Sequence, residues 1–117
     1  AMDLRHYQAL ASRTLLAEPD FQIAPDEVLI AWNALGLVGE AGEVAELVKK
    51  GIFHQRGLDL ERLKKELGDV LWYVAAVASN VGLTLDEIAW HNLQKLQARF
   101  PDGWDADRST HKTGAAA

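Results

Sequence analysis

Stretches of helical periodicity between prolines constrain this chain more than any other feature of its sequence. All three prolines, Pro19, Pro25 and Pro101, fall where such a stretch begins or ends. The spacing of apolar residues predicts four helices, over about 3–18, 25–50, 59–81 and 84–100. Because no segment shows the alternation typical of a strand, we expect an all-α fold with a four-helix-bundle-like protomer over residues 1–104. The remainder, 105–117, is predicted to be an irregular, flexible tail.

Local signals predict where these helices start and stop. Gly51 is expected to end the second helix and Gly82 the third, since glycine commonly follows the last helical residue. Asp59 is a favoured residue for capping the start of the third helix. Thr84 and Glu87 have the spacing of a capping box at the start of the fourth. The connection between the second and third helices is therefore expected over about 51–58.

Composition excludes several classes of function. With 117 residues the chain has room for one domain, and without cysteine it has neither disulfides nor thiolate metal sites. A net charge of −5 argues against a nucleic-acid polymer as partner, and implies that a polyanionic substrate needs a bridging cation. The longest unbroken apolar run, 70–78, is too short to cross a bilayer, so no membrane partner is expected. The N-terminal residues lack a secretory pattern, which favours a cytoplasmic location.

Two acid pairs carry the chemistry that this sequence suggests. Glu40 and Glu43 are three residues apart, as are Glu66 and Asp69, so each pair projects from one face of its helix. Both pairs adjoin apolar segments, which favours a shared divalent metal site, since Mg²⁺ prefers carboxylate oxygens. The alternative is a solvated face on which each acid pairs with a nearby lysine. A di-iron bundle is disfavoured because the chain has no Glu-x-x-His.

Three segments give the chain a family resemblance: 36–50, 65–73 and 92–101. They contain Glu-x-x-Glu, then Glu-x-x-Asp after 22 residues, and finally Asn-x-x-Lys-x-x-x-Arg. In these motifs the chain resembles the MazG-like all-α nucleoside triphosphate pyrophosphohydrolases. The resemblance implies hydrolysis of a (deoxy)nucleoside triphosphate between the α and β phosphates, in the service of nucleotide-pool cleaning. It also implies a homodimer or homotetramer with the site built partly at the subunit interface.

The resemblance assigns roles to individual residues. Glu40, Glu43, Glu66 and Asp69 would be the metal-binding and catalytic residues, one of them orienting the attacking water, with Mg²⁺ as cofactor and Mn²⁺ as a substitute. Six further residues are candidates for binding substrate: Asn33, Lys50, Tyr73, Asn92, Lys95 and Arg99. The last three lie at i, i+3 and i+7 and can grip phosphate from one helix face. The alternatives are a solvated stripe for those three and satisfied core groups for Asn33 and Tyr73.

Apolar residues and glycines predict further features of assembly and packing. The many apolar side chains, including Trp32, Trp72 and Trp90, should leave an apolar patch on an isolated protomer, which predicts a homo-oligomer. Gly36, with the glycines that follow at 39 and 42, predicts a smooth ridge that a helix or nucleotide can approach closely. A non-catalytic helical module for metal binding or protein interaction remains the alternative function.

Overall fold

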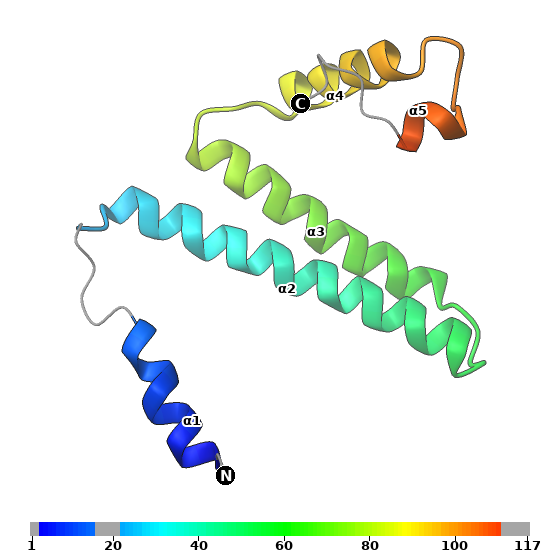
Figure 1. Cartoon of the computed structure of the whole chain (residues 1–117). Helices are drawn as coiled ribbons and strands as arrows, with labels where there is room; N and C mark the ends of the chain where they lie inside the picture. Colours follow the sequence, from blue (N-terminus) through cyan, green and yellow to red (C-terminus); the bar gives the residue numbers. More distant parts are fainter. Residues whose placement is uncertain (1–2, 16–21, 111–117) are drawn as a thin grey trace.

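The chain folds into helices joined by short connections, as Figure 1 shows. This computed structural model describes residues 3–15 and 22–110. The helices are α1 (Leu4–Ala11), followed by a 3₁₀ turn (Ser12–Thr14), α2 (Pro25–Phe53), α3 (Leu60–Asn80), α4 (Leu85–Arg99) and α5 (Ala106–Thr110). The described residues contain no strand, which confirms the all-α prediction.

The predicted capping residues begin α3 and α4. The Asp59 carboxylate accepts a hydrogen bond from the backbone N–H of Arg62 at 3.1 Å. At α4 the capping box is complete: the Thr84 N–H donates to the Glu87 carboxylate at 2.8 Å, and the Glu87 N–H donates to the Thr84 hydroxyl at 3.2 Å. Gly82 follows α3 with a φ of +77°, a conformation that glycine adopts without steric cost. These three boundaries were predicted correctly.

The end predicted for the second helix was wrong. Gly51 lies inside α2, which continues to Phe53, and the connection to α3 starts at His54. Gly51 is buried because the loop returns over it: the Gly57 N–H donates to the Gly51 carbonyl at 3.1 Å. A Cβ at position 51 would lie 3.0 Å from the Gly57 carbonyl oxygen. The glycine therefore gives the loop room to pack on the helix and does not end it.

The two ends of the chain also differ from the prediction. The first helix ends at Ala11, and the Ser12 hydroxyl donates to the Gln8 carbonyl at 2.6 Å as the chain tightens into the 3₁₀ turn. The rest of the predicted helix, 16–18, lies outside the described residues. In the predicted irregular tail, α5 forms five residues of helix, which the Asp105 carboxylate caps by accepting from the Asp107 N–H at 2.8 Å. Residues 111–117 of that tail lie outside the described part.

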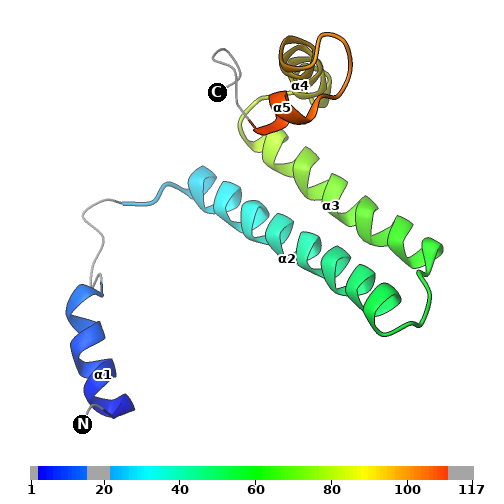
Figure 2. The same cartoon turned by 45° about the vertical axis from the view of Figure 1, so that its right-hand side comes forward.

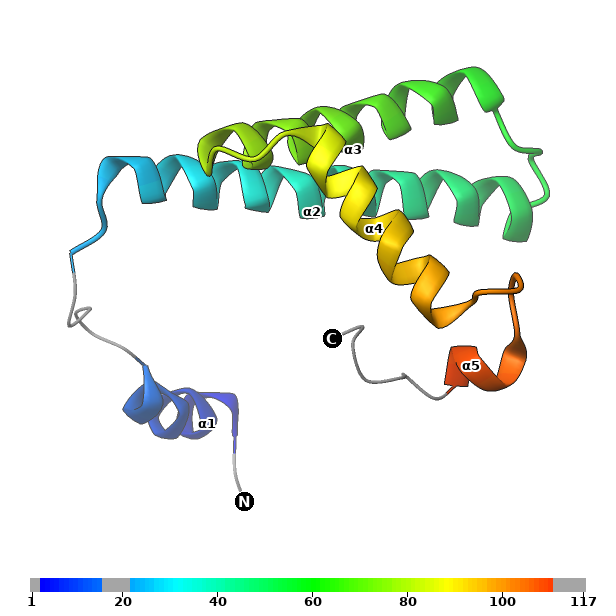
Figure 3. The same cartoon turned by 90° about the horizontal axis from the view of Figure 1, so that it is seen from above.

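Only α2 and α3 pack together along their length. They form a long antiparallel hairpin, whereas α1 stands away from it in Figures 1, 2 and 3 and α4 stands away from it in Figures 1 and 2. The chain turns by 104° between α3 and α4, which directs α4 away from α2. A single described protomer therefore supplies one helical hairpin, and the expected packing of four helices is not completed within it.

The protomer is much more open than a monomer of its size. Its radius of gyration is 20.5 Å, against about 13 Å for a compact domain of this length. It exposes 10072 Å², against about 6,300 Å² for a compact monomer of this mass. Of the described residues only Gly51 and Ala78 are buried. Hydrophobic side chains that a stable fold would cover thus remain in contact with solvent.

The exposed hydrophobic side chains and the polar ones occupy different parts of the hairpin. More than half of the surface of each of six large apolar side chains is exposed: Trp32, Leu35 and Val38 of α2, and Leu67, Leu71 and Trp72 of α3. The acids and the two asparagines that bond across the hairpin lie instead where α2 faces α3. We call this line of facing residues the seam. A polar seam with apolar surroundings is suited to a binding or catalytic site. The exposed apolar side chains around it remain to be covered by another molecule.

By length and composition, α2 is apolar enough to cross a membrane, with a mean hydropathy of 1.3 over its best window. The bent pair of α3 and α4 reaches the same level if it is counted as one span. A core helix of a helical bundle has the same length and composition, and Glu40 and Glu43 lie within α2 where it faces α3. The expectation that the chain has no membrane partner stays a prediction.

Candidate active site

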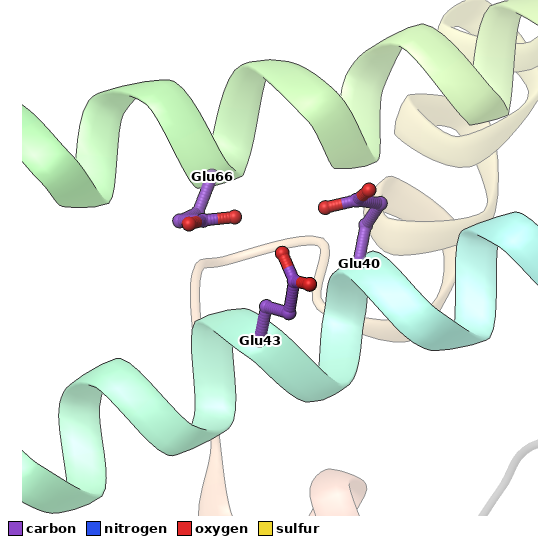
Figure 4. A group of neighbouring side chains, drawn as sticks. All are labelled: Glu40, Glu43 and Glu66. Carbon is purple, nitrogen blue, oxygen red and sulfur yellow. The ribbon is translucent and has the colours of Figure 1, made fainter.

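Three carboxylates meet in the middle of the seam. Glu40 and Glu43 point from α2 toward α3, and Glu66 points from α3 toward α2, as Figure 4 shows. One oxygen of each lies within 4.8 Å of the others, close enough for a single cation to contact all three. The helical spacing explains the convergence: Glu40 and Glu43 share a face of α2, and the antiparallel pairing places Glu66 across from them. The pairing predicted from sequence is therefore realised for these three acids.

The cluster holds its negative charge at an energetic cost. Desolvation raises the pKa of Glu40, and the hydrogen bond and negative charge of Glu43 raise that pKa further. The pKa of Glu66 is raised first by its hydrogen bond with Glu43, then by desolvation and by the charge of Glu43. Arg62 partly offsets this rise at Glu66. Carboxyl groups this close share protons because adjacent like charges repel in a partly desolvated place.

The unsatisfied oxygens of this cluster fit a bound cation. One carboxylate oxygen of Glu40 and one of Glu66 are buried without a hydrogen-bond partner in the structure. Buried polar atoms normally have partners, so two unpaired acceptors in one acidic cluster are suited to a positive ligand. Oxygen ligands alone select hard cations such as Mg²⁺ or Mn²⁺. These residues therefore fit a hard divalent metal.

Asp69, the fourth predicted acid, lies outside the group of three. Its negative charge raises the pKa of both Glu40 and Glu66, so it is close enough to act on the cluster electrostatically. It follows Glu66 by three residues on α3 and thus shares its face. Asp69 extends the acidic part of the seam, and its role as a ligand stays a prediction.

A hollow of about 290 Å³ adjoins the acids on the side of the α2–α3 loop. Its lining combines three acids, Glu43, Glu46 and Glu66, with the cations Lys50 and Arg62. Lys50 forms an ion pair with Glu46 of this lining at 3.4 Å. Positive groups next to a metal-binding cluster are what the anionic end of a polyphosphate needs. Lys50, a predicted substrate-binding residue, thus lies beside the acids, and its role in binding stays a prediction.

The other two predicted residues of the hairpin lie beyond the acids in the opposite direction. The ring of Tyr73 lies directly over Gly36, where a Cβ would come within 2.2 Å of it. The Asn33 side-chain amide donates a hydrogen bond to the Asn80 side-chain oxygen across the seam at 2.7 Å. Both predicted residues thus lie along the seam with the acids. At Gly36 the structure shows the close approach predicted from the glycines, since the Tyr73 ring packs against this position.

The three predicted residues of α4 are not brought to the acids within one protomer. Asn92 and Lys95 are exposed on a helix that stands away from the hairpin. Arg99 is engaged elsewhere: its guanidinium donates to the carbonyl of Arg108 at 2.9 Å and to that of Ser109, at the end of α5. Arg99 also stacks on the Phe100 ring, 5.2 Å from its centroid. A single chain therefore separates the α4 candidates from the acid cluster.

Comparison with known proteins places the chain in a family. A family model described as the MazG nucleotide pyrophosphohydrolase domain matches residues 31–104, well over half of the chain. The chain belongs to this family. The chain is also 43% identical over 80 residues to the Gene 37 protein of Mycobacterium phage L5, an alignment that covers 63% of this chain and 68% of the phage protein. No solved structure matches it significantly.

Membership of the MazG family ties the acid cluster to divalent-metal chemistry, on which the family generally depends. The matched range includes all of α3 and α4 and every acid of the cluster. It ends at Trp104, so that α5 and its contacts with Arg99 fall outside it. The family therefore covers the hairpin and α4, the two parts that one protomer keeps apart.

The sequence analysis missed two residues that the structure places along the seam. Arg62 lines the hollow beside the acids, and its signal was its place one turn before Glu66 on the same face. Asn80 is the partner of Asn33, and it could be found only by pairing α2 with α3 in the right register. Both lie outside the motifs that carried the resemblance.

Proposed function

We propose that this MazG family member hydrolyses a (deoxy)nucleoside triphosphate between its α and β phosphates, releasing the monophosphate and pyrophosphate. The observation that carries the proposal is the meeting of Glu40, Glu43 and Glu66 across the seam, with two buried oxygens unpaired. A metal held there would lie beside the hollow that Lys50 and Arg62 line, where these two cations can neutralise a triphosphate chain from the other side. The family match supports the same reaction class.

The residues of the seam would have different roles in the reaction. Glu40, Glu43, Glu66 and Asp69 would hold Mg²⁺, which neutralises phosphate oxygens and polarises water when it is bound. A carboxylate oxygen of the cluster that is not bound to the metal can accept a proton from the attacking water. Lys50 and Arg62 hold the β and γ phosphates and stabilise the pyrophosphate as it leaves.

A second copy of the chain is part of the proposal. Asn92 and Lys95 cannot reach the acids of their own protomer in the described arrangement. In a homodimer or homotetramer, α4 of one copy can cover the hairpin of another and bring these groups to the phosphates. The exposed apolar side chains on both elements provide the driving force for that contact.

A direct test measures pyrophosphate release from a panel of nucleoside and deoxynucleoside triphosphates with and without Mg²⁺, with Mn²⁺ as a second metal. ³¹P NMR of the products distinguishes the bond that is cleaved. We expect a monophosphate and intact pyrophosphate, formed only with metal. Orthophosphate with a nucleoside diphosphate would refute the reaction class. The absence of any metal-dependent product would favour the non-catalytic metal-binding or interaction module instead.

A further inference from the structure

Helix α1 is a short amphipathic helix that lacks a packing surface. Its side chains Leu4, Tyr7 and Leu10 lie on one face, and all three are exposed. Among the described elements, α1 has extended contact only with the 3₁₀ turn that follows it. A helix of eight residues is marginal in water by itself. The apolar face of α1 therefore needs a surface to pack on.

The C-terminal part of α4 provides a second exposed apolar surface. A hollow of about 620 Å³, which we call the α4 hollow, is lined by Trp90, Leu93, Leu96, Gln97, Phe100 and Trp104. Its volume is within the range of ligand pockets, about 300–1,000 Å³. The α4 hollow can therefore accept several side chains of another segment.

A turn after α4 builds one wall of the α4 hollow. Helix α4 ends at Arg99, and the Gly103 N–H donates to the Phe100 carbonyl at 3.2 Å. Gly103 has a φ of +93°, which glycine adopts without steric cost, and this turn returns Trp104 to the lining. The Arg99 guanidinium holds the segment that follows by donating to the Arg108 carbonyl at 2.9 Å. The wall is thus fixed by hydrogen bonds before any partner is present.

The two apolar surfaces have opposite charges beside them. Residues 3–15, which include α1, contain two arginines, Arg5 and Arg13, and one acid, Asp3. Residues 100–107, which include Trp104, contain no basic residue and three acids, Asp102, Asp105 and Asp107. Complementary charges favour the encounter of two surfaces and fix their orientation. The apolar face of α1 and the α4 hollow therefore match in both hydrophobicity and charge.

We propose that α1 of one copy packs its Leu4–Tyr7–Leu10 face into the α4 hollow of a second copy. The α2–α3 hairpin separates α1 from α4 of the same chain in Figures 1 and 2, which favours the hollow of another copy. Leu93 of the hollow and Lys95 are two residues apart, and so about 200° apart around α4. Docking of α1 thus leaves the Lys95 face free to cover a hairpin. The inference concerns assembly and does not rest on the proposed hydrolysis.

Introduced cysteines can test this contact, because the chain has none of its own. Tyr7→Cys and Leu93→Cys are prepared separately, unfolded, refolded together in equal amounts, and treated with a short bismaleimide that bridges cysteines lying close together. Each variant alone should give little covalent dimer, since its cysteine meets no cysteine in the partner. The mixture should give at least about fivefold more, because mixed assemblies join the two positions.

Ala9→Cys is the matched control for Tyr7→Cys. Ala9 is also exposed, but it lies about 200° around α1 from Tyr7 and therefore points away from the docked face. Mixed with Leu93→Cys, it should give no more covalent dimer than the single variants do. If circular dichroism shows that Leu93→Cys fails to fold, Leu96→Cys in the same lining takes its place.

The charges provide an independent readout. When Arg5→Glu and Arg13→Glu are added to Tyr7→Cys, the yield of mixed dimer should fall about threefold or more, because acids then meet the acids of 100–107. An unchanged yield would overturn the match of charges on which the docking depends.

The remaining outcomes separate this inference from its alternatives. Equal yields from Ala9→Cys and Tyr7→Cys, or no dimer above the level of the single variants, would overturn the docking. A bridge within single chains of the double variant Tyr7→Cys/Leu93→Cys, seen by mass spectrometry, would place α1 on its own α4 and overturn the role of the second copy. Pyrophosphate release by the wild type is measured beside these yields. Release without the bridge would remove the docking alone, and the bridge without release would remove the proposed function alone.

Discussion

At the scale of single residues, one carboxyl group of the site interacts with two neighbouring carboxyl groups. Glu43 shares hydrogen bonds with both Glu40 and Glu66, and each bond raises the pKa of the partner. A bound cation would relieve the repulsion between these carboxylates, and so would a substitution that removes one charge. The two changes have opposite consequences for activity, because only the cation leaves all the metal ligands in place.

We therefore expect Glu40→Gln, Glu43→Gln, Glu66→Gln and Asp69→Asn to lower metal-dependent turnover by about a hundredfold or more, as loss of a ligand should exceed loss of a supporting group. The metal-free fold should survive or gain stability, because one of several clustered like charges is gone. Pyrophosphate release and urea unfolding of each variant measure the two effects. If two or more of the variants kept near wild-type rates, the metal-site assignment would be wrong.

The same carboxyls predict how stability depends on pH. The raised pKa values of Glu40 and Glu66 mean that the folded protein binds more protons than the unfolded chain above 4.5, their ordinary value. Their contribution is present below 4.5 and is lost as pH rises through the raised pKa values. Glu46 acts oppositely: its lysine partners lower its pKa, so its contribution is present above 4.5 and is lost as pH falls through that lowered pKa.

In metal-free buffer at fixed protein concentration, the free energy of unfolding should therefore contain a component that decreases between pH 4.5 and 7. This component should be smaller in Glu40→Gln, which cannot ionise at that position. Added Mg²⁺ should recover more stability at pH 7 than at pH 4.5, because protons compete with the metal for Glu40 and Glu66 at low pH. Parallel pH curves for the wild type and this variant would contradict the assignment of the shift to the cluster.

At the scale of elements, α4 contains two cations with different surroundings. Lys95 is exposed and lies on a face predicted to grip phosphate, whereas Arg99 bonds to the end of α5. We expect Lys95→Ala to lower kcat/KM about ten- to a hundredfold, since a charge-assisted contact is lost. Metal binding should stay nearly unchanged, which calorimetry with Mg²⁺ can measure. If kcat/KM of Lys95→Ala were unchanged, this face of α4 would be a solvated surface without a role in binding phosphate.

How much the sequence predicted differs between elements for a physical reason. Asp59, Thr84 and Gly82 act on residues within one turn, so their roles in capping were predictable from local sequence. Gly51 was misread because its small size is needed by a loop residue, Gly57, whose approach only the folded hairpin creates.

The acids follow the same division. Local spacing was sufficient to place Glu40 beside Glu43, and the apolar segments beside both acid pairs already favoured a site shared with Glu66. The bond between Asn33 and Asn80 depends on the register of α2 against α3, which local pattern does not encode. Features that arise within one helix were therefore predictable, whereas contacts that depend on the register between helices were not.

At the scale of the whole molecule, exposed area is the most informative quantity. The protomer exposes 10072 Å², about 3,800 Å² more than a compact monomer of its mass. A standard interface covers only about 800 Å² of each partner, so an excess of this size predicts an obligate assembly. We expect light scattering at micromolar concentration to give a homodimer or homotetramer. A monomer of 12.9 kDa would refute the assembly and the shared site with it.

A shared site has a consequence that an assembly with self-contained sites lacks. If the acids come from one copy and Lys95 from another, two inactive variants can complement each other. In a dimer of Glu43→Gln with Lys95→Ala, one site combines both defects while the other joins the intact acids of one copy to the intact lysine of its partner. After unfolding and joint refolding in equal amounts, about half the dimers are mixed, and activity should return to about a quarter of the wild-type rate.

The two homodimers refolded separately and then combined are the control for this experiment, because their sites contain no intact combination. Recovery should follow the fraction of mixed dimers as the ratio of the two variants is changed, with its maximum at equal amounts. Sites contained within single copies would give no recovery at any ratio, since every acid cluster would then meet the lysine of its own chain. That outcome would require α4 to fold back onto its own hairpin, against the separation of the two elements in the structure.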